Sequence, residues 1–192
     1  VIQSIDVETI YDVPLKMSEE GLNRVVLEKL NLKAKQELNL NNWNSFLKKF
    51  KNPKYNIKIG LVGKYVELQD SYKSILESLI HAGAENETEI DVISIHSEHI
   101  DKSNVEELLN CLNGLIVAPG FGERGIEGKI TAITYARENK IPFFGICLGM
   151  QMAVIEYARN KVGLVEANST EMVPNCKVPV IDLMESQKKI IK

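Results

Sequence analysis

From residue 141 to residue 151 the chain reads Ile-Pro-Phe-Phe-Gly-Ile-Cys-Leu-Gly-Met-Gln. An apolar strand runs into a Gly-x-Cys-x-Gly turn, and a helix follows. Such a sharp turn leaves no space for side chains on either flank, which explains glycine at positions 145 and 149. Cys147 would then lie above the helix N-terminus, where the helix dipole and backbone N–H groups favour a thiolate. The pattern predicts a cysteine nucleophile. The alternative is a small buried side chain, as most free cysteines are.

Length, charge and cysteine content narrow the class of protein. The 192 residues can bury one substantial core and still leave an appendage. A net charge of -3 argues against nucleic acid as the principal partner. No apolar run reaches the ~18 residues that cross a bilayer, and no N-terminal signal segment is evident. The cysteines are odd in number and lack metal-ligand spacing, so we expect no metal site, no disulfide framework and a cytoplasmic location; they are Cys111, Cys147 and Cys176.

Short apolar runs alternate with amphipathic stretches from Tyr55 onward. Strands are predicted over residues 57–62, 89–95, 115–118 and 142–146, and helices over residues 71–82, 105–112 and 126–139. Strands joined by single helices predict an α/β fold, with a doubly wound, mostly parallel sheet and helices on both faces. Ligands of such sheets bind at the carboxyl ends of the strands, where the cysteine turn and the loop of residues 119–125 both emerge.

The first fifty residues show a different pattern. Residues 1–17 read as an extended, mixed segment closed by Pro14. Helices are predicted over residues 18–32, opened by Ser18-Glu19-Glu20, and over residues 40–50. The polar stretch Lys51-Asn52-Pro53-Lys54 marks a predicted boundary between residues 1–54 and a sheet domain of residues 55–192.

A cysteine that attacks an amide needs an oxyanion hole and a proton-transfer partner. The glycines of the loop Pro119-Gly120-Phe121-Gly122 can bring backbone N–H groups close to a carbonyl, although a tight structural turn is the alternative. Pro119 has no N–H, so Gly120 and the N–H of Leu148 are the predicted donors. No histidine is placed to serve Cys147, and each is expected at the surface or at a helix end: His81, His96 and His99.

Residues 145–151 resemble the class I, or triad, glutamine amidotransferases, in which a cysteine attacks the side-chain amide of glutamine and ammonia is released. Four longer stretches are similar to the CTP synthase family, namely residues 63–74, 119–129, 136–142 and 166–171. Residues 6–14 resemble the end of that family's synthetase domain. The resemblance covers nearly the whole chain and is weakest between residues 32 and 56.

The resemblance implies a two-domain ligase in which ammonia from glutamine converts UTP to CTP, with ATP and Mg²⁺ used in the synthetase domain. It implies no metal or cofactor in the glutaminase domain, no nucleic-acid or membrane partner, and a homo-oligomer, a tetramer in the family. Cys147 matches the nucleophile, and the glutamine pocket matches Gly120, Leu148, Gly149, Met150, Gln151 and Glu171. A segment that touches ATP matches Ile5, Asp6 and Val7, with Ile5 where a lysine is expected.

Two departures from the family pattern bear on activity. The loop reads Val-Ala-Pro-Gly-Phe-Gly over residues 117–122, where the family has Val-Pro-Gly-Gly-Phe-Gly. The family's His-Pro-Glu sequence does not occur in residues 1–192, so we expect a middle piece of the enzyme that is inactive alone. Residues 1–54 would be the end of the synthetase domain and the linker, and residues 55–192 an incomplete glutamine amidotransferase domain.

Two alternatives remain open. A DJ-1-type cysteine protein shares the strand, turn and helix but lacks the Glu-Arg-Gly-Ile-Glu-Gly-Lys loop of residues 123–129. A non-catalytic regulatory or assembly module could keep the same fold without turnover.

Overall fold

The structure is a computed structural model that describes residues 1–188. The strands are β1 (Tyr55–Gly63), β2 (Thr88–His96), β3 (Gly114–Val117), β4 (Phe143–Gly145), β5 (Ala167–Ser169) and β6 (Val178–Ile181). The α-helices are α1 (Val13–Glu19), α2 (Leu22–Lys29), α3 (Asn41–Lys51), α4 (Lys73–Glu85), α5 (Val105–Leu109), α6 (Ile126–Glu138), α7 (Leu148–Tyr157) and α8 (Glu185–Lys188). Short 3-10 helices are η1 (Ile10–Asp12), η2 (Gln69–Tyr72) and η3 (Ser97–His99), and η4 (Ala158–Val162) is a π-helix.

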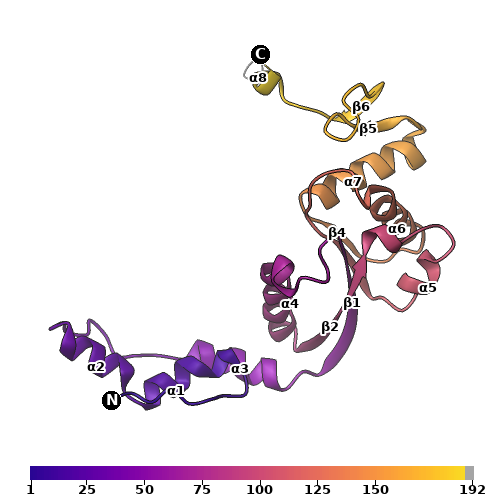
Figure 1. The fold of residues 1–192 in the computed structure, drawn as a ribbon. Helices are drawn as coiled ribbons and strands as arrows, with labels where there is room; N and C mark the ends of the chain where they lie inside the picture. The colour runs from indigo at the N-terminus through magenta and orange to yellow at the C-terminus, as the bar shows by residue number, and fades with distance from the viewer. Residues whose placement is uncertain (189–192) are drawn as a thin grey trace. The chain divides into compact units, whose positions relative to one another are not determined.

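A four-stranded sheet of order β2-β1-β3-β4 carries the predicted site (Figure 1). Strands β1 and β3 are parallel with Leu61 opposite Ile116, and β3 and β4 are parallel with Val117 opposite Gly145. All four residues of β3 are buried, as expected for a central strand covered on both faces. The predicted α/β fold with a parallel sheet is confirmed.

Alternation along the strands separates two apolar clusters, one on each face of the sheet. Leu61 and Ile116 belong to the cluster against which Ile75, Leu76 and Leu79 of α4 pack. Val62 and Val117, one position further along each strand, belong to the larger cluster that α5, α6 and α7 cover. Figure 1 shows α4 on one side of the sheet and α5 and α6 on the other, so the prediction of helices on both faces is also confirmed.

The chain forms two compact units. One unit holds residues 1–55 and 80–89, and the other holds residues 56–79 and the chain from residue 90 onward. In the first unit, Tyr11 is 8% exposed and packs edge-on against Phe46, Phe50 and His81, with ring centroids 5.2, 5.5 and 5.7 Å away. The indole Nε1 of Trp43 donates to the carbonyl of Tyr11 at 2.8 Å, so this aromatic cluster is also held by a polar contact.

Three expectations for local structure were wrong. Residues 10–19 are helical rather than extended, because Pro14 falls in the first turn of α1, where its missing N–H removes no intrahelical bond. One helix over residues 18–32 is instead two, because Gly21 adopts the left-handed conformation (φ 75°) and interrupts it. Helix α5 ends at Leu109, three residues before the predicted end, although Leu112 remains buried.

The end of the described chain adds a second, two-stranded sheet in which β5 and β6 run parallel. Within residues 1–188, none of the helices combines the length and the apolar character that crossing a membrane requires.

Candidate active site

Strand β4, Cys147 and helix α7 form the predicted sharp turn. The Ile146 N–H donates to the Val117 carbonyl at 3.0 Å, which fixes the end of β4 against β3. Cys147 then adopts φ 53° and ψ -109°, a conformation rare for a residue with a side chain. Such backbone strain costs about 1–3 kcal/mol and persists where the surrounding structure enforces it, often at active sites. Cys147 is exposed at this position.

Close packing explains the glycines on both sides of the cysteine. A Cβ placed on Gly145 would lie 2.7 Å from the backbone of Gly149 and from the Met150 nitrogen. A Cβ placed on Gly149 would lie 2.1 Å from the Val117 carbonyl oxygen. Both distances are below any normal contact with backbone atoms, so the turn requires glycine at both positions.

The loop after β3 meets the start of α7. Val117 and Gly145 are register partners, so the loop and the cysteine turn leave the sheet from neighbouring strand ends. A Cβ placed on Gly120 would lie 3.5 Å from Cδ2 of Leu148, so the two residues predicted to supply the oxyanion donors are neighbours. Leu148 is 3% exposed and is the first residue of α7, so its backbone N–H has no carbonyl partner within the helix.

A buried lysine at the same place was not predicted. Lys129, on α6, is 1% exposed, and its Nζ donates to the carbonyl of Ala118 at 3.0 Å. Burial and repulsion by Lys64 lower the pKa of Lys129 to about 8, and Cys147 acts in the opposite direction. Helical periodicity carried the signal, since this position shares a face with the buried residues Ile126, Ile130, Ala132, Ile133 and Ala136.

Two of the predicted glutamine-binding residues, Gln151 and Glu171, line one cavity of about 420 Å³. The cavity lies between α7 and the β5–β6 region. Its other lining residues are Ser169, Thr170, Ile181, Asp182 and Leu183. The Glu171 N–H donates to Oγ of Ser169 at 3.1 Å, which holds the start of this turn.

The remaining predicted residues do not line this cavity. Gly149 is buried in the turn, and Met150, 50% exposed, lines a separate apolar hollow of about 540 Å³ with Val154, Tyr157 and Leu164 among its walls. The predicted ATP-contacting residues, Ile5, Asp6 and Val7, precede η1 in the other unit and lie outside any helix or strand. Among the described residues no cluster of acidic, histidine or cysteine side chains could hold a metal ion.

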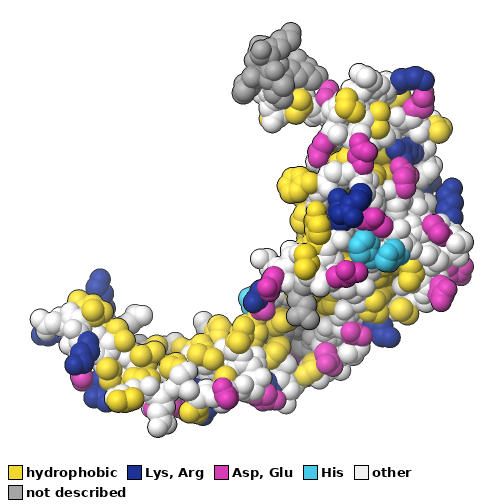
Figure 2. Space-filling model, in the orientation of Figure 1, with side chains coloured by type: hydrophobic (Ala, Val, Ile, Leu, Met, Phe, Trp, Pro, Cys, Tyr) yellow, Lys and Arg dark blue, Asp and Glu magenta, His cyan; other side chains and the backbone are white. Residues whose placement is uncertain are grey.

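The three histidines lie in two different parts of the chain. His81 belongs to the first unit, where its Nε2 is 3.1 Å from the Tyr11 hydroxyl. His96 and His99 stack on each other at the end of β2, with ring centroids 4.6 Å apart. Histidine side chains are cyan in Figure 2, which shows that histidine is present on the face drawn. Strand β2 is three strand spacings from β4, or roughly 14 Å. His96 and His99 are therefore not placed to exchange protons with Cys147.

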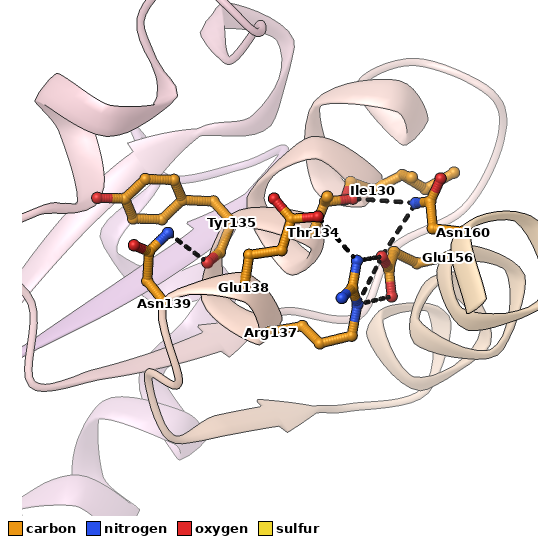
Figure 3. A network of polar contacts seen from close by, with 8 residues as sticks. All are labelled: Ile130, Thr134, Tyr135, Arg137, Glu138, Asn139, Glu156 and Asn160. Carbon is orange, nitrogen blue, oxygen red and sulfur yellow. Dashed lines mark hydrogen bonds and ion pairs between the residues drawn. The ribbon is translucent and has the colours of Figure 1, made fainter.

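An ion pair joins the two helices that follow the site's two loops (Figure 3). Nε of Arg137 on α6 donates to both carboxylate oxygens of Glu156 on α7, at 3.0 and 3.2 Å. Nδ2 of Asn160 donates to the same carboxylate at 3.0 Å and to the hydroxyl of Thr134 at 3.3 Å. The Glu156 side chain is 2% exposed, so this network fixes α6 against α7 from inside the fold.

Residues 67–190 match the model of a protein family described as glutamine amidotransferase class-I. The match covers well over half of the chain. The chain belongs to the class I glutamine amidotransferases. The nucleophile turn lies within the matched region, which favours the amidotransferase interpretation over the DJ-1-type alternative.

Similar proteins narrow the comparison within the amidotransferases. The chain is 66% identical over 190 residues to a CTP synthase of Flavobacterium johnsoniae and 54% identical over 196 residues to one of Methanocaldococcus jannaschii. Each match covers 99% of this chain but only 35% and 36% of the relative. Among solved structures, the glutaminase domain of Trypanosoma brucei CTPS with bound acivicin is similar, with a TM-score of 0.63 and 38% identity over 68% of this chain and 51% of that one.

Proposed function

We propose that this amidotransferase chain is the nucleophile-bearing part of a CTP synthase, and that Cys147 releases ammonia from glutamine. The observation that carries the proposal is the convergence of an exposed cysteine at a helix N-terminus with Gly120 and Leu148. The identity to CTP synthases supports the choice among amidotransferases.

The proposed reaction begins when the Cys147 thiolate attacks the side-chain carbonyl carbon of glutamine. The carbonyl oxygen becomes an oxyanion, which the N–H groups of Gly120 and Leu148 stabilise. The C–N bond then breaks as the leaving nitrogen takes up a proton and departs as ammonia. Water then hydrolyses the thioester, which gives glutamate and frees Cys147. Gln151 and Glu171 would hold the amino-acid end of glutamine in their shared cavity. We place the proton-transfer group outside the described residues, because His96 and His99 lie at the end of β2, three strands from β4.

The wider proposals follow the same relatives. Ammonia would convert UTP to CTP with ATP and Mg²⁺ at a synthetase site to which residues 1–54 contribute, in a cytoplasmic homo-oligomer. Ile5, Asp6 and Val7 would lie near ATP, and no step of the glutaminase reaction uses them.

A cysteine substitution tests the proposal. The protein used should contain this chain together with the further regions that its CTP synthase relatives carry. Cys147→Ala should abolish CTP formation with glutamine, because the nucleophile is gone, but keep CTP formation with added ammonia. Cys111→Ala is the matched control, since Cys111 is also exposed, and it should keep both activities. Glutamine-dependent synthesis that survives Cys147→Ala would contradict the proposal and favour a non-catalytic module.

A further inference from the structure

Packing alone does not explain the buried Lys129. An ammonium group in a protein interior is costly unless its donors are paired, and it has three N–H donors. Among the described residues its Nζ has one hydrogen-bond acceptor, the Ala118 carbonyl. An apolar side chain of similar length would fill the same space without burying a charge. The buried charge is therefore better explained by a function of Lys129 at the cysteine site.

The hydrogen bond from Lys129 acts on the predicted oxyanion loop. The Ala118 carbonyl belongs to the peptide that continues into Pro119, whose ring fixes φ near -65°. Once that peptide is held, one free torsion of Pro119 decides where the Gly120 N–H points. Nζ of Lys129 also lies close to Gly120, since a Cβ placed on Gly120 would be 3.4 Å from this nitrogen. Lys129 is thus placed to orient Gly120.

The ammonium group also adds charge to the site. Lys64, at the end of β1, donates from its Nζ to the Phe121 carbonyl at 3.0 Å, so two lysines hold carbonyls of one short loop. The titratable groups that act on the charge of Lys129 are Lys64, which disfavours it, and Cys147, which favours it as a thiolate. A negative charge on the sulfur therefore favours the ammonium form of Lys129.

We propose that Lys129 is a positioning residue of the cysteine site, which orients the turn from Ala118 to Gly120 and keeps a positive charge within reach of Cys147. The inference rests on the proposed function of Cys147 as the glutaminase nucleophile. A thiolate and a glutamine-derived oxyanion are both negative, so one ammonium group serves both steps.

Alkylation by iodoacetamide tests the role on this chain without substrate. Lys129→Met keeps the side-chain length and removes the charge, so alkylation of Cys147 at pH 7 should slow by roughly tenfold. The deficit should shrink toward pH 9.5, where the native lysine is also neutral. Cys111 in the same molecule is the internal control, and Lys102→Met, at an exposed lysine, is the matched variant. A well-folded Lys129→Met protein whose Cys147 is alkylated at the native rate would overturn the proposal.

A second measurement does not require the Lys129→Met protein to fold. NMR of the chain labelled with ¹³C-lysine can follow the titration of Lys129. The Lys129 signal is identified as the one that is missing from the spectrum of Lys129→Arg. Replacing Cys147 with alanine should move the Lys129 midpoint, about 8 in the native chain, to lower pH by roughly half a unit or more. An unchanged midpoint would overturn the electrostatic part. Neither experiment measures glutamine hydrolysis, so both remain interpretable if the proposed function fails.

Discussion

Gly145 and Gly149 decide how closely β4, Cys147 and α7 can pack. Each faces backbone atoms, which cannot move aside as the tip of a side chain can. This packing enforces the unusual backbone angles of Cys147, so the geometry of the proposed nucleophile depends on two residues that have no functional group. At the residue scale the site is therefore set by volume as much as by chemistry.

We predict that Gly149→Ala destabilises the chain although alanine is the better helix former. Alanine gains up to about 1 kcal/mol in a helix interior. The new methyl group would meet the Val117 carbonyl at 2.1 Å, and overpacking of this kind costs about 1–3 kcal/mol or more. Thermal unfolding should show a lower Tm.

Gly120→Ala is the matched control for that measurement. Its methyl group would meet only the ends of the Lys129 and Leu148 side chains, at 3.4 and 3.5 Å. Its Tm should change much less. Equal Tm values for the two variants would show that the backbone contact at Gly149 does not limit packing.

At the scale of elements, α6 and α7 position the two halves of the site. Helix α6 follows the loop that holds Gly120 and carries Lys129, and α7 begins directly after Cys147. The Arg137–Glu156 pair ties these helices together beyond the site (Figure 3). A change in this pair should therefore affect both stability and the alignment of the loop with the cysteine.

Glu156→Gln should lower the free energy of unfolding by about 3 kcal/mol at pH 7, because it breaks an ion pair whose carboxylate is buried. Glu138→Gln removes the other carboxylate beside Arg137. The Glu138 side chain is 61% exposed, so this change should lower the free energy of unfolding by less than about 0.5 kcal/mol. Denaturant unfolding of both variants makes the comparison.

The same pair gives a pH dependence of defined sign. Burial alone would raise the pKa of Glu156, but hydrogen bonds from Arg137 and Asn160 outweigh it, so the pKa lies below its usual 4.5. The stabilisation is complete above the unfolded value and is lost as pH falls through the lower folded value. The difference between native chain and Glu156→Gln should shrink below about pH 4.5. A difference that stays constant down to pH 3 would contradict this account.

The four strands of the main sheet, the helix α3 and the sharp turn at Cys147 were predictable, because apolar runs, glycine spacing and strand length indicate the same local structure. Strands β5 and β6 were not predicted, and neither were the bounds of α1 and α2, since Pro14 and Gly21 are compatible with several conformations. Lys129 was missed because a lysine is normally assigned to the surface, and burial depends on how α6 packs. Gln151 and Glu171 were predicted through resemblance, whereas their shared cavity depends on where β5 and β6 fold.

At the scale of the whole molecule, the proposed reaction would be divided between parts of a longer protein. The chain spans about 35% of the length of the CTP synthase of Flavobacterium johnsoniae that it matches. Within the described residues the proposed nucleophile lies beside the residues of the predicted oxyanion donors, whereas His96 and His99 lie at the end of β2, three strands from β4. Under the proposed function, the group that moves protons would belong to another part of the protein.

We therefore predict that the purified chain hydrolyses glutamine negligibly although Cys147 can still be alkylated. The thiolate could form a thioester, but ammonia must be protonated as it leaves and water must be activated for deacylation. Loss of a general acid–base group typically lowers the rate ~10²–10⁴-fold. Ammonia release by this chain should be compared with release by a protein that also carries the regions present in the relatives. Similar turnover by the two would overturn the placement of the proton-transfer group outside the described residues, and His81, His96, His99 and Lys129 would then be the candidates for that group.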